Sequence, residues 1–466
     1  MAATQTVQQS VDIVIVGGGH AGLCAAITAA GSKARILLLE VAPQAMRGGN
    51  SRHTRNLRAA HSSPTATMGG IYSQTEYLQD LLKVTSGNTN QSLARLMIDE
   101  SESLLVWLGK QGVAFQKAIS GSLNLESTNA FFLGGGKALL NALYGKAQAL
   151  GVRVLYEANV VCLEVENNRF EGLVYEHKGQ QIHLSAEAVI LTSGGFQANK
   201  DWMKSAWGDA AENFLIRGTP YNKGLPLKEM IRHQAKLTGD AKQCHAVAID
   251  ARAPRYDGGI VSRLDCVSFG IVVNNRALRF YDEGEDYWPK RYAIWGRLVA
   301  QQPGQIAFAI LDSKTEGLYI PSLYPPISAN DISTLAGLLE IDPIVLNRTV
   351  SQFNNSTNNG LFQPESRDGL ATHNIEPRKS NWALPLDTPP YLAFPLRPGI
   401  TFTYLGLEVN SKAMAKNQSG HPFENVFAAG EIMAGNILGE GYCAGTGMTI
   451  GGVFGRIAGR QAAACL

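Results

Sequence analysis

The sequence has few cysteines, and they show no pattern that signals a metal or redox centre. Six cysteines are scattered along 466 residues, and no CxxC pair occurs. A zinc or iron–sulfur site would need clustered ligands of that kind, so we expect no metal site. Scattered cysteines suit a reducing compartment, and we therefore expect a cytoplasmic protein.

Long apolar runs and an excess of either charge are also missing. No apolar run approaches the roughly 20 residues that span a bilayer. The first ten residues, MAATQTVQQS, are polar and uncharged, so we expect no secretory signal peptide. With 41 basic and 39 acidic residues the net charge is +2, which argues against nucleic acid as a partner.

What the sequence does contain begins with VDIVIVGGGHAGLCAAITAA at residues 11–30. The apolar run 11–16 predicts a strand buried on both faces, and 21–30 predicts a helix. A GxGxxG motif joins the two elements. A second apolar stretch, ARILLLEV, predicts the next strand, so the order strand, glycine turn, helix and strand is typical of a dinucleotide-binding unit.

The residues of this motif have distinct expected roles. Gly17 makes the tight turn, Gly19 lets the backbone approach a pyrophosphate, and Gly22 lets helix and strand pack closely. The helix N-terminus faces the phosphates. Glu40 ends the second strand, 18 residues beyond Gly22, and its carboxylate can accept hydrogen bonds from a ribose.

Two later segments of the chain favour FAD over NAD as the dinucleotide. AVILTSGGFQAN (188–199) and ENVFAAGEIMAGN (424–436) each predict a buried strand that ends in glycine. A nucleotide domain assembled from segments so far apart is similar to the large flavoproteins. The predicted closing helix, 447–464, could direct its N-terminus toward the flavin ring and stabilise a reduced anion.

The expected fold class is α/β, a Rossmann-like FAD-binding domain of the glutathione reductase type with an inserted α+β cap domain. Residues 225–345 change character and contain aromatic and proline-rich stretches such as YIPSLYPPI. We therefore assign 1–224 and 346–466 to the FAD-binding domain and 225–345 to a cap that binds the substrate.

Four short motifs together resemble the fumarate reductase/succinate dehydrogenase flavoprotein family: GGNS (48–51), TSGGF (192–196), AAGE (428–431) and FGRIAG (454–459). The resemblance covers nearly the whole chain. GGNSRHTRNLR, KRYAIWGRLVAQQPGQIAFAILD and GNILGEGYCAGTGMTIG are most similar to family members that desaturate a tricarboxylate next to its carboxylates. The resemblance implies bound FAD, a small carboxylic-acid substrate and a separate membrane-bound electron-transfer protein as acceptor.

The family's membrane-bound members attach FAD covalently through a histidine, and that position reads Ser51 here, so non-covalent FAD is expected. The motifs and the resemblance together imply these cofactor-binding residues: Gly17, Gly19, His20, Ala21, Gly22, Glu40, Gly48, Gly49, Asn50, Ser51, Val161, Ser193, Gly194, Gly430, Glu431, Gly445, Gly447 and Met448.

The resemblance also implies catalytic residues in the cap. The family's proton-shuttling arginine stands ten residues before the glutamine of an AQ pair, and Arg291 matches it. The histidine that grips a substrate carboxylate matches His245. The family's next contact, a Thr-Glu pair, reads Ser262-Arg263 here, so an acid has become a base.

Arginine is a poor base, with a pKa above about 12, so it needs neighbouring cations or a relay acid. The family's relay glutamate is missing from this sequence. Asp265, Glu283 or Asp286 could substitute for it.

Two departures from the family argue against fumarate or succinate as substrate. A second histidine position reads Thr401-Phe402, and a carboxylate-binding arginine position reads Tyr442. Tyr442 followed by CAGTG resembles 3-ketosteroid dehydrogenases, whose substrate is uncharged, so Tyr442 and Tyr404 are further candidates at the site. A fumarate-reductase-like enoate reductase and a non-catalytic flavoprotein are also compatible with these motifs.

The stretch MRGGNSRHTRNLRAAH (46–61) contains four arginines and two histidines and no acid. A tricarboxylate carries three negative charges at neutral pH, and burying it requires paired cations. His53, Arg55 and Arg263 are the expected substrate-binding cations, with His245 and Arg291. The run could instead form a solvated surface or a scaffold for the FAD phosphates.

Overall fold

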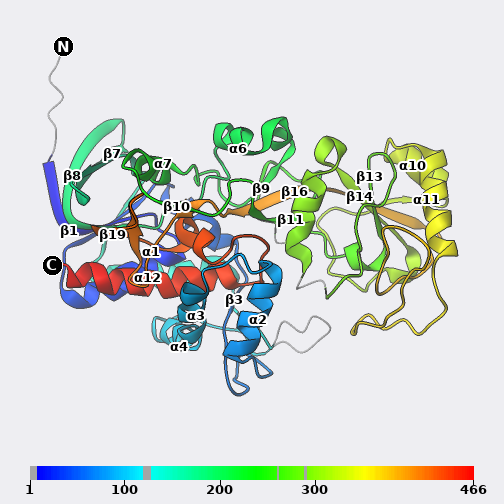
Figure 1. The fold of residues 1–466 in the computed structure, drawn as a ribbon, viewed down its shortest axis with the longest axis horizontal. Helices are drawn as coiled ribbons and strands as arrows, with labels where there is room; N and C mark the ends of the chain where they lie inside the picture. The colour runs from blue at the N-terminus through cyan, green and yellow to red at the C-terminus, as the bar shows by residue number, and fades with distance from the viewer. Residues whose placement is uncertain (1–7, 119–126, 260–261, 288–290) are drawn as a thin grey trace, which may run out of the picture.

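The computed structural model describes residues 8–118, 127–259, 262–287 and 291–466. The expectation about a leader peptide falls mainly on residues 1–7, which lie outside these ranges. The described chain forms two lobes, each built on its own sheet (Figure 1). The mixture of helices with parallel and antiparallel strands confirms the predicted α/β class.

The first lobe contains an eight-stranded sheet with the order β18-β19-β8-β1-β2-β5. Off this path, β7 pairs with β8, and β6 pairs with β7. Strand β1 pairs in parallel with both β2 and β8, and β2 is buried at all five positions. Such two-sided burial explains the apolar runs of the sequence. The strands are β1 (Gln8–Val16), β2 (Ile36–Glu40), β5 (Arg153–Tyr156), β6 (Asn159–Glu166), β7 (Arg169–His177), β8 (Gln180–Leu191), β18 (Met414–Lys416) and β19 (Pro422–Ala428).

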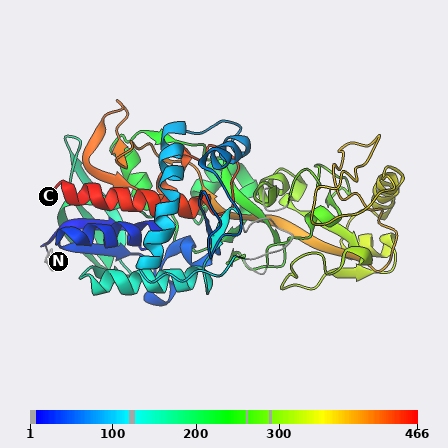
Figure 2. The same ribbon diagram turned by 90° about the horizontal axis from the view of Figure 1, so that it is seen from below.

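Two helices from opposite ends of the chain cover this sheet side by side (Figures 1 and 2). They are α1 (His20–Ala29) and α12 (Thr446–Ala464), which confirms the two helices predicted there. Their backbones approach closely because α12 presents Gly455 and Gly459, where a Cβ atom would overlap carbonyl oxygens of α1. Helix α5 (Gly135–Ala149) packs beside α1.

The second lobe contains a seven-stranded sheet with the order β12-β9-β16-β14-β13, and β11 and β15 also pair with β16. The long strand β16 runs from this lobe back toward the first (Figure 1). The strands are β9 (Leu215–Arg217), β11 (Cys244–Asp250), β12 (Tyr256–Asp257), β13 (Ile271–Asn274), β14 (Ala307–Asp312), β15 (Ile327–Ala329) and β16 (Tyr391–Thr403); the helices are α9 (Trp295–Ala300), α10 (Ile332–Leu338) and α11 (Pro343–Asn355).

The predicted cap limits, 225 and 345, differ from the limits of this sheet. β9 precedes residue 225 and β16 follows residue 345, yet both are central strands of the cap. Helix α7 (Leu225–Arg232), by contrast, packs on β6 of the first lobe. We therefore propose that the cap comprises 214–217 and 244–403. The predicted limits differ because the composition of the sequence indicated the aromatic stretches of the cap but not which strands pair within it.

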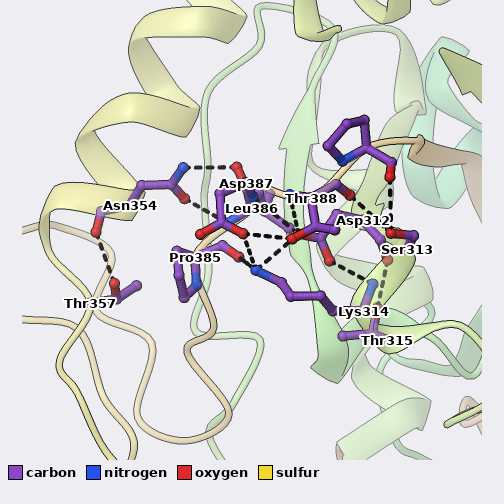
Figure 3. A network of polar contacts seen from close by, with 11 residues as sticks. Asp312, Ser313, Lys314, Thr315, Asn354, Thr357, Pro385, Leu386, Asp387 and Thr388 are labelled. Carbon is purple, nitrogen blue, oxygen red and sulfur yellow. Dashed lines mark hydrogen bonds and ion pairs between the residues drawn. The ribbon is translucent and has the colours of Figure 1, made fainter. Parts of the chain in front are cut away.

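A polar network shows how residues after 345 join the cap (Figure 3). The buried Asp312 carboxylate, at the end of β14, accepts hydrogen bonds from the backbone N–H groups of Asp387 (3.0 Å) and Thr388 (3.1 Å). Asn354 of α11 exchanges two hydrogen bonds with the backbone of Leu386, at 2.7 and 2.8 Å. These bonds attach the segment before β16 to β14 and α11.

The remaining elements lie around the two sheets. None of the helices in the described ranges combines the length and the apolar character needed to cross a membrane. The elements are helices α2 (Gln74–Val84), α3 (Gln91–Asp99), α4 (Ser101–Lys110) and α6 (Lys200–Trp207), and the strand pairs β3 (Asn56–Arg58) with β4 (Asn129–Phe131) and β10 (Leu237–Thr238) with β17 (Gly406–Leu407).

Candidate active site

A cavity of about 670 Å³ is lined by residues of both lobes. Its first-lobe end contains the glycine turn after β1 and the N-terminus of α1. Of the predicted cofactor-binding residues, these line it: Gly17, Gly19, His20, Ala21, Glu40, Gly48, Gly49, Asn50, Ser51, Ser193, Gly194, Gly430, Glu431, Gly445, Gly447 and Met448.

The first and third glycines of the motif leave no room for a side chain. Gly17 has a φ of 109°, and a Cβ there would lie 2.5 Å from the carbonyl oxygen of Thr192. Gly22 does not line the cavity; a Cβ there would overlap the Gly17 carbonyl oxygen, which is the close packing predicted for the third glycine. Gly19 is the residue before α1, and both Gly19 and the N-terminus of α1 face the cavity.

Glu40 lies at the cavity wall where β2 ends. Its Oε2 atom accepts hydrogen bonds from the backbone N–H groups of Gly18 (3.2 Å) and Gly48 (3.2 Å), and Oε1 accepts one from Ala42 (2.9 Å). Burial raises the pKa of this carboxyl, and the backbone donors oppose that rise. A fixed carboxylate beside a glycine turn fits the ribose and pyrophosphate of FAD.

Val161 is the other predicted cofactor residue that does not line the cavity. Ala158, Asn159 and Val160 line it instead, where the chain enters β6. Successive side chains of a strand point to opposite faces, so a shift of one residue moves the contact to the other side.

The loop after β2 connects the two lobes. Asn50 accepts a hydrogen bond from the Thr219 backbone N–H (2.9 Å) and donates one to the Thr401 carbonyl (2.5 Å). Ser51 Oγ accepts a hydrogen bond from the His20 backbone N–H (3.1 Å). Burial lowers the pKa of His20 to about 4, so that histidine is neutral near pH 7.

Glu431 is a buried acid at the first-lobe end. It accepts a hydrogen bond (2.9 Å) from the backbone N–H of Thr403, the last residue of β16. Burial raises its pKa to about 7, against hydrogen bonds from Thr403, Gly195 and Gln197.

The arginines of the stretch 46–61 point in different directions. Arg47 lies over a tyrosine ring, with its Cζ 4.6 Å from the ring centroid. Arg52 donates to a backbone carbonyl seven residues back (3.0 Å). Arg58 is buried and pairs with a carboxylate oxygen at 3.3 Å. Of this run's basic residues, only His53 and Arg55 line the cavity. Most basic residues of the run therefore contact other parts of the protein and do not face the cavity.

The cap end of the cavity is cationic. His53, Arg55, His245 and Arg263, all predicted substrate contacts, line it together with Arg217. Sequence reasoning missed Arg217; its only signal is a cation at the end of a short apolar run, LIR, before a glycine.

The positive charges at this end exceed their acidic partners. Arg263 pairs with Asp265 at 2.7 Å, whereas neither Arg55 nor Arg217 has an ion pair within the described ranges. The charge of Arg263, burial and the charge of Arg217 lower the pKa of Arg55 to about 10, although the charge of Asp265 opposes this decrease. Guanidinium groups that repel one another in a buried site favour binding of an anion.

His53 is neutral at this end despite its basic surroundings. Burial is the largest cause of its lowered pKa of about 4, and the charges of Arg52 and Arg217 add to it. A neutral imidazole can donate one hydrogen bond and accept another, so His53 contributes hydrogen bonding, and not charge, to the site.

His245 and Tyr442 form a stacked pair in the cavity wall. Their ring centroids are 3.8 Å apart and the planes differ by 7°. A register shift in the β11–β16 pairing between His245 and Ala246 places the histidine at an irregularity, where side chains are commonly re-aimed. Tyr442 Oη accepts a hydrogen bond from the Gly447 backbone N–H (3.1 Å).

Both ring nitrogens of His245 are buried without a hydrogen-bond partner in the described structure. Burial lowers its pKa well below the ordinary value, with the charges of Arg217 and Arg263 adding to the effect. Burial also acts on Tyr442, where it raises the pKa of the hydroxyl. Both rings are therefore uncharged near pH 7, and His245 has two unused hydrogen-bonding atoms for a ligand.

Arg291 does not line the cavity in this conformation, although its neighbour Tyr292 does. Its guanidinium pairs with Glu285, which also accepts a hydrogen bond from the Tyr281 hydroxyl (2.6 Å). The buried Nε atom of Arg291 has no hydrogen-bond partner among the described residues.

The three acids considered as relay partners of Arg291 are engaged elsewhere. Asp265 pairs with Arg263, Glu283 pairs with a buried arginine at 2.6 Å, and Asp286 pairs with a lysine of the first lobe at 3.1 Å. Glu285 was not predicted, because a pairing across six residues in an irregular segment leaves no periodic signal.

Tyr404 is a core residue. It is fully buried, does not line the cavity, and its hydroxyl donates to the Gly441 carbonyl. A buried tyrosine whose hydroxyl is satisfied by backbone has no free atom for a substrate.

The fold and the site define a flavin-dependent oxidoreductase: a dinucleotide cavity closed by a cap that carries ionisable residues. Residues 12–449 match the family described as FAD binding domain, and the chain belongs to that family. It is therefore an FAD-dependent enzyme. Among the described residues no group of three or more metal-ligating side chains occurs.

Known relatives are similar over almost the full chain. NADH:fumarate oxidoreductase of Klebsiella pneumoniae is 24% identical over 98% of this chain, which spans 48% of that protein's length. A probable fumarate reductase of Shewanella frigidimarina is 25% identical over 98% of the chain and 75% of its own length. The structure of 3-ketosteroid Δ1-dehydrogenase from Sterolibacterium denitrificans matches with a TM-score of 0.76 at 17% identity, covering 98% of this chain and 100% of that one.

Proposed function

We propose that this enzyme oxidises tricarballylate to cis-aconitate, as a tricarballylate dehydrogenase. The observation that carries the proposal is the cationic cap end of the cavity, where Arg55, Arg217 and Arg263 gather in the same cavity as the nucleotide motif. Phe402 and Tyr442 also line it, at positions where fumarate reductases are expected to carry a histidine and an arginine. We therefore propose that the carboxylate contacts lie toward the cap, as a differently shaped acid would require.

FAD, when bound, would accept the hydride removed from one carbon of the C–C bond that becomes the double bond next to the carboxylates. The chain's own residues bind and orient the acid: guanidinium groups pair with carboxylates in a planar, often bidentate geometry. His245, neutral and unpartnered, can hydrogen-bond to a carboxylate.

We propose that Arg291 takes the proton. This requires the Arg291 guanidinium to enter the cavity when the substrate binds, and Glu285 would then connect Arg291 to solvent.

Three further expectations belong to this proposal: FAD is held without a covalent bond, the electrons leave through a separate membrane-bound electron-transfer protein, and the enzyme acts in the cytoplasm. Ser51, which accepts a hydrogen bond from the His20 backbone, supports non-covalent attachment because it replaces the linking histidine. The chain spans about half the length of the NADH:fumarate oxidoreductase that it matches.

The test is anaerobic reduction of the purified yellow protein with a panel of acids, followed as bleaching of flavin absorbance near 450 nm. We expect tricarballylate to bleach the flavin faster than succinate or a monocarboxylate, with cis-aconitate as product. Denaturation with acid should release intact FAD. Absence of bleaching by every carboxylate would overturn the proposed function, and flavin retained on the polypeptide would overturn non-covalent attachment.

A second candidate is dehydrogenation of an uncharged ring substrate such as a 3-ketosteroid. It is favoured by an apolar part of the cavity wall in the cap, made by Phe269, Tyr287, Leu318, Ile320 and Trp382. Bleaching by a ketosteroid but by no acid would select this function. A reduced enzyme that is reoxidised by cis-aconitate or fumarate, but not reduced by their saturated acids, would instead select an enoate reductase.

A further inference from the structure

Arg217 is held in the cap by regular sheet structure. It ends β9, which pairs in parallel with β12 on one side and with β16 on the other. Gly259 (φ 61°) follows β12, and a Cβ there would overlap the aliphatic stem of Arg217. The loop therefore packs directly on the arginine, which restricts its side chain to one direction. Sites built on strands hold their groups more accurately than sites on loops.

Among the described residues, the guanidinium of Arg217 has hydrogen-bond partners that are neutral. Its Nε atom donates to the Gly259 carbonyl (3.2 Å) and its Nη1 atom donates to Thr401 Oγ1 (3.3 Å). Asp257, a nearby acid, uses its Oδ2 atom for the Gly259 backbone N–H (2.9 Å) and for the Ser262 hydroxyl. Arg217 is buried and lines the cavity. A buried cation without an ionic partner is costly, unless an anion from outside the chain completes the site.

The neighbouring arginines differ from Arg217 in origin and in pairing. Arg55 enters the cavity from the first lobe, in the loop that precedes β3, and Arg263 is already partly neutralised by Asp265 at 2.7 Å. Arg217, on β9, thus lines the cavity in addition to Arg55 and Arg263, the two arginines predicted from the sequence. Three cations from three separate segments can contact three separate carboxylates.

We propose that Arg217 is a specificity-determining residue: it binds one carboxylate of the substrate and thereby makes the enzyme prefer tricarboxylates over dicarboxylates. The inference rests on the proposed function for the identity of the substrate. A charge-assisted hydrogen bond to a desolvated partner corresponds to a roughly tenfold to hundredfold change in affinity. The effect of Arg217 should therefore appear only for ligands that carry the additional carboxylate.

The experiment compares tricarballylate with methylsuccinate, which is the same acid with one terminal carboxylate replaced by hydrogen. Wild type, Arg217→Gln and Arg217→Lys are titrated anaerobically, and Kd is obtained from perturbation of the flavin spectrum separately from the rate of bleaching. Arg397→Gln is the matched control, because Arg397 is another cap arginine, it donates to backbone carbonyls at 3.2 and 3.4 Å, and it does not line the cavity. Flavin occupancy and Tm are measured for every variant.

We expect Arg217→Gln to weaken tricarballylate binding by roughly tenfold to a hundredfold and methylsuccinate binding by less than about threefold, with FAD retained. Arg217→Lys should recover part of the loss, and Arg397→Gln should match wild type. Equal losses for both acids, no loss for either, or loss of FAD would overturn the inference. If wild type binds tricarballylate more tightly than methylsuccinate without bleaching, the proposed reaction fails while the binding comparison still decides the role of Arg217. If wild type does not prefer tricarballylate in binding, the inference is wrong.

Discussion

The two ends of the cavity recognise their ligands by different means. At the first-lobe end, backbone turns and acidic side chains face the ligand, and Gly17, Gly19 and Glu40 come from a single stretch of 24 residues. At the cap end, charged side chains face it, and Arg55, Arg217 and Arg263 come from segments that are distant in sequence. A shared cofactor can be recognised by a local motif, whereas a particular substrate is recognised by residues that only the folded chain brings together.

This difference has energetic consequences. Backbone groups at the first-lobe end cannot be changed by substitution without altering the turn itself, so changes there should affect every substrate equally. Side chains at the cap end can be replaced singly, because strands and loops hold their backbones independently. Substitutions at the cap end should therefore separate substrates from one another while FAD stays bound.

The largest expected effect is at Arg291. Arg291→Gln should lower kcat by several orders of magnitude with FAD still bound, because no other proposed group would take the substrate proton. The measurement is the limiting rate of anaerobic flavin bleaching by tricarballylate. Tyr442→Phe is the comparison variant, and it should lose much less. A rate for Arg291→Gln within about tenfold of wild type, equivalent to roughly 1.4 kcal/mol, would contradict the assignment and make Tyr442 the leading candidate.

A smaller effect is expected at Arg55. Arg55→Ala should lower kcat/KM for a tricarboxylate by roughly tenfold to a hundredfold, since a desolvated charge-assisted hydrogen bond is lost. A monocarboxylate should suffer much less. The matched control is Arg52→Ala, three residues earlier in the same basic run, because the Arg52 side chain donates to a backbone carbonyl outside the cavity.

The measurement is kcat/KM across tri-, di- and monocarboxylates, with flavin occupancy checked in each preparation. A uniform loss across the panel, or loss of FAD, would show that Arg55 braces the cofactor and would remove the contrast between the two ends. Raised salt should weaken capture of the tricarboxylate only modestly, because buried charges are poorly screened.

The last expected effect concerns the pH dependence of stability and Glu431, at the first-lobe end. Because its pKa is raised to about 7 from an ordinary value of 4.5, the folded protein holds this proton more tightly than the unfolded chain. Its contribution to stability is fully present below pH 4.5 and is lost as the pH rises through 7, a difference of about 3 kcal/mol. Glu431→Gln, which has no proton to lose, should remove that dependence. Thermal unfolding of both holoproteins from pH 5 to 8 checks this, and parallel pH profiles would contradict it.

Local physics made much of the first lobe predictable. The apolar run before Gly17, the glycine spacing and the acid at position 40 are properties of adjacent residues, and the structure contains the strand, turn, helix and strand expected from them. The closing helix is likewise apparent in its own sequence. Each of these elements buries its apolar residues against neighbours whose identity hardly matters, so the pattern alone indicates them.

Tertiary structure alone decided the boundaries of the cap and the composition of its site. β16 pairs with strands from four other segments, and no local pattern reports which strands meet. The same pairings place Arg217 in the cavity and leave Tyr404 in the core. In the basic run 46–61, only packing separated His53 and Arg55, which line the cavity, from Arg47, Arg52 and Arg58. Side-chain direction depends on contacts between residues distant in sequence, and those contacts exist only once the chain has folded.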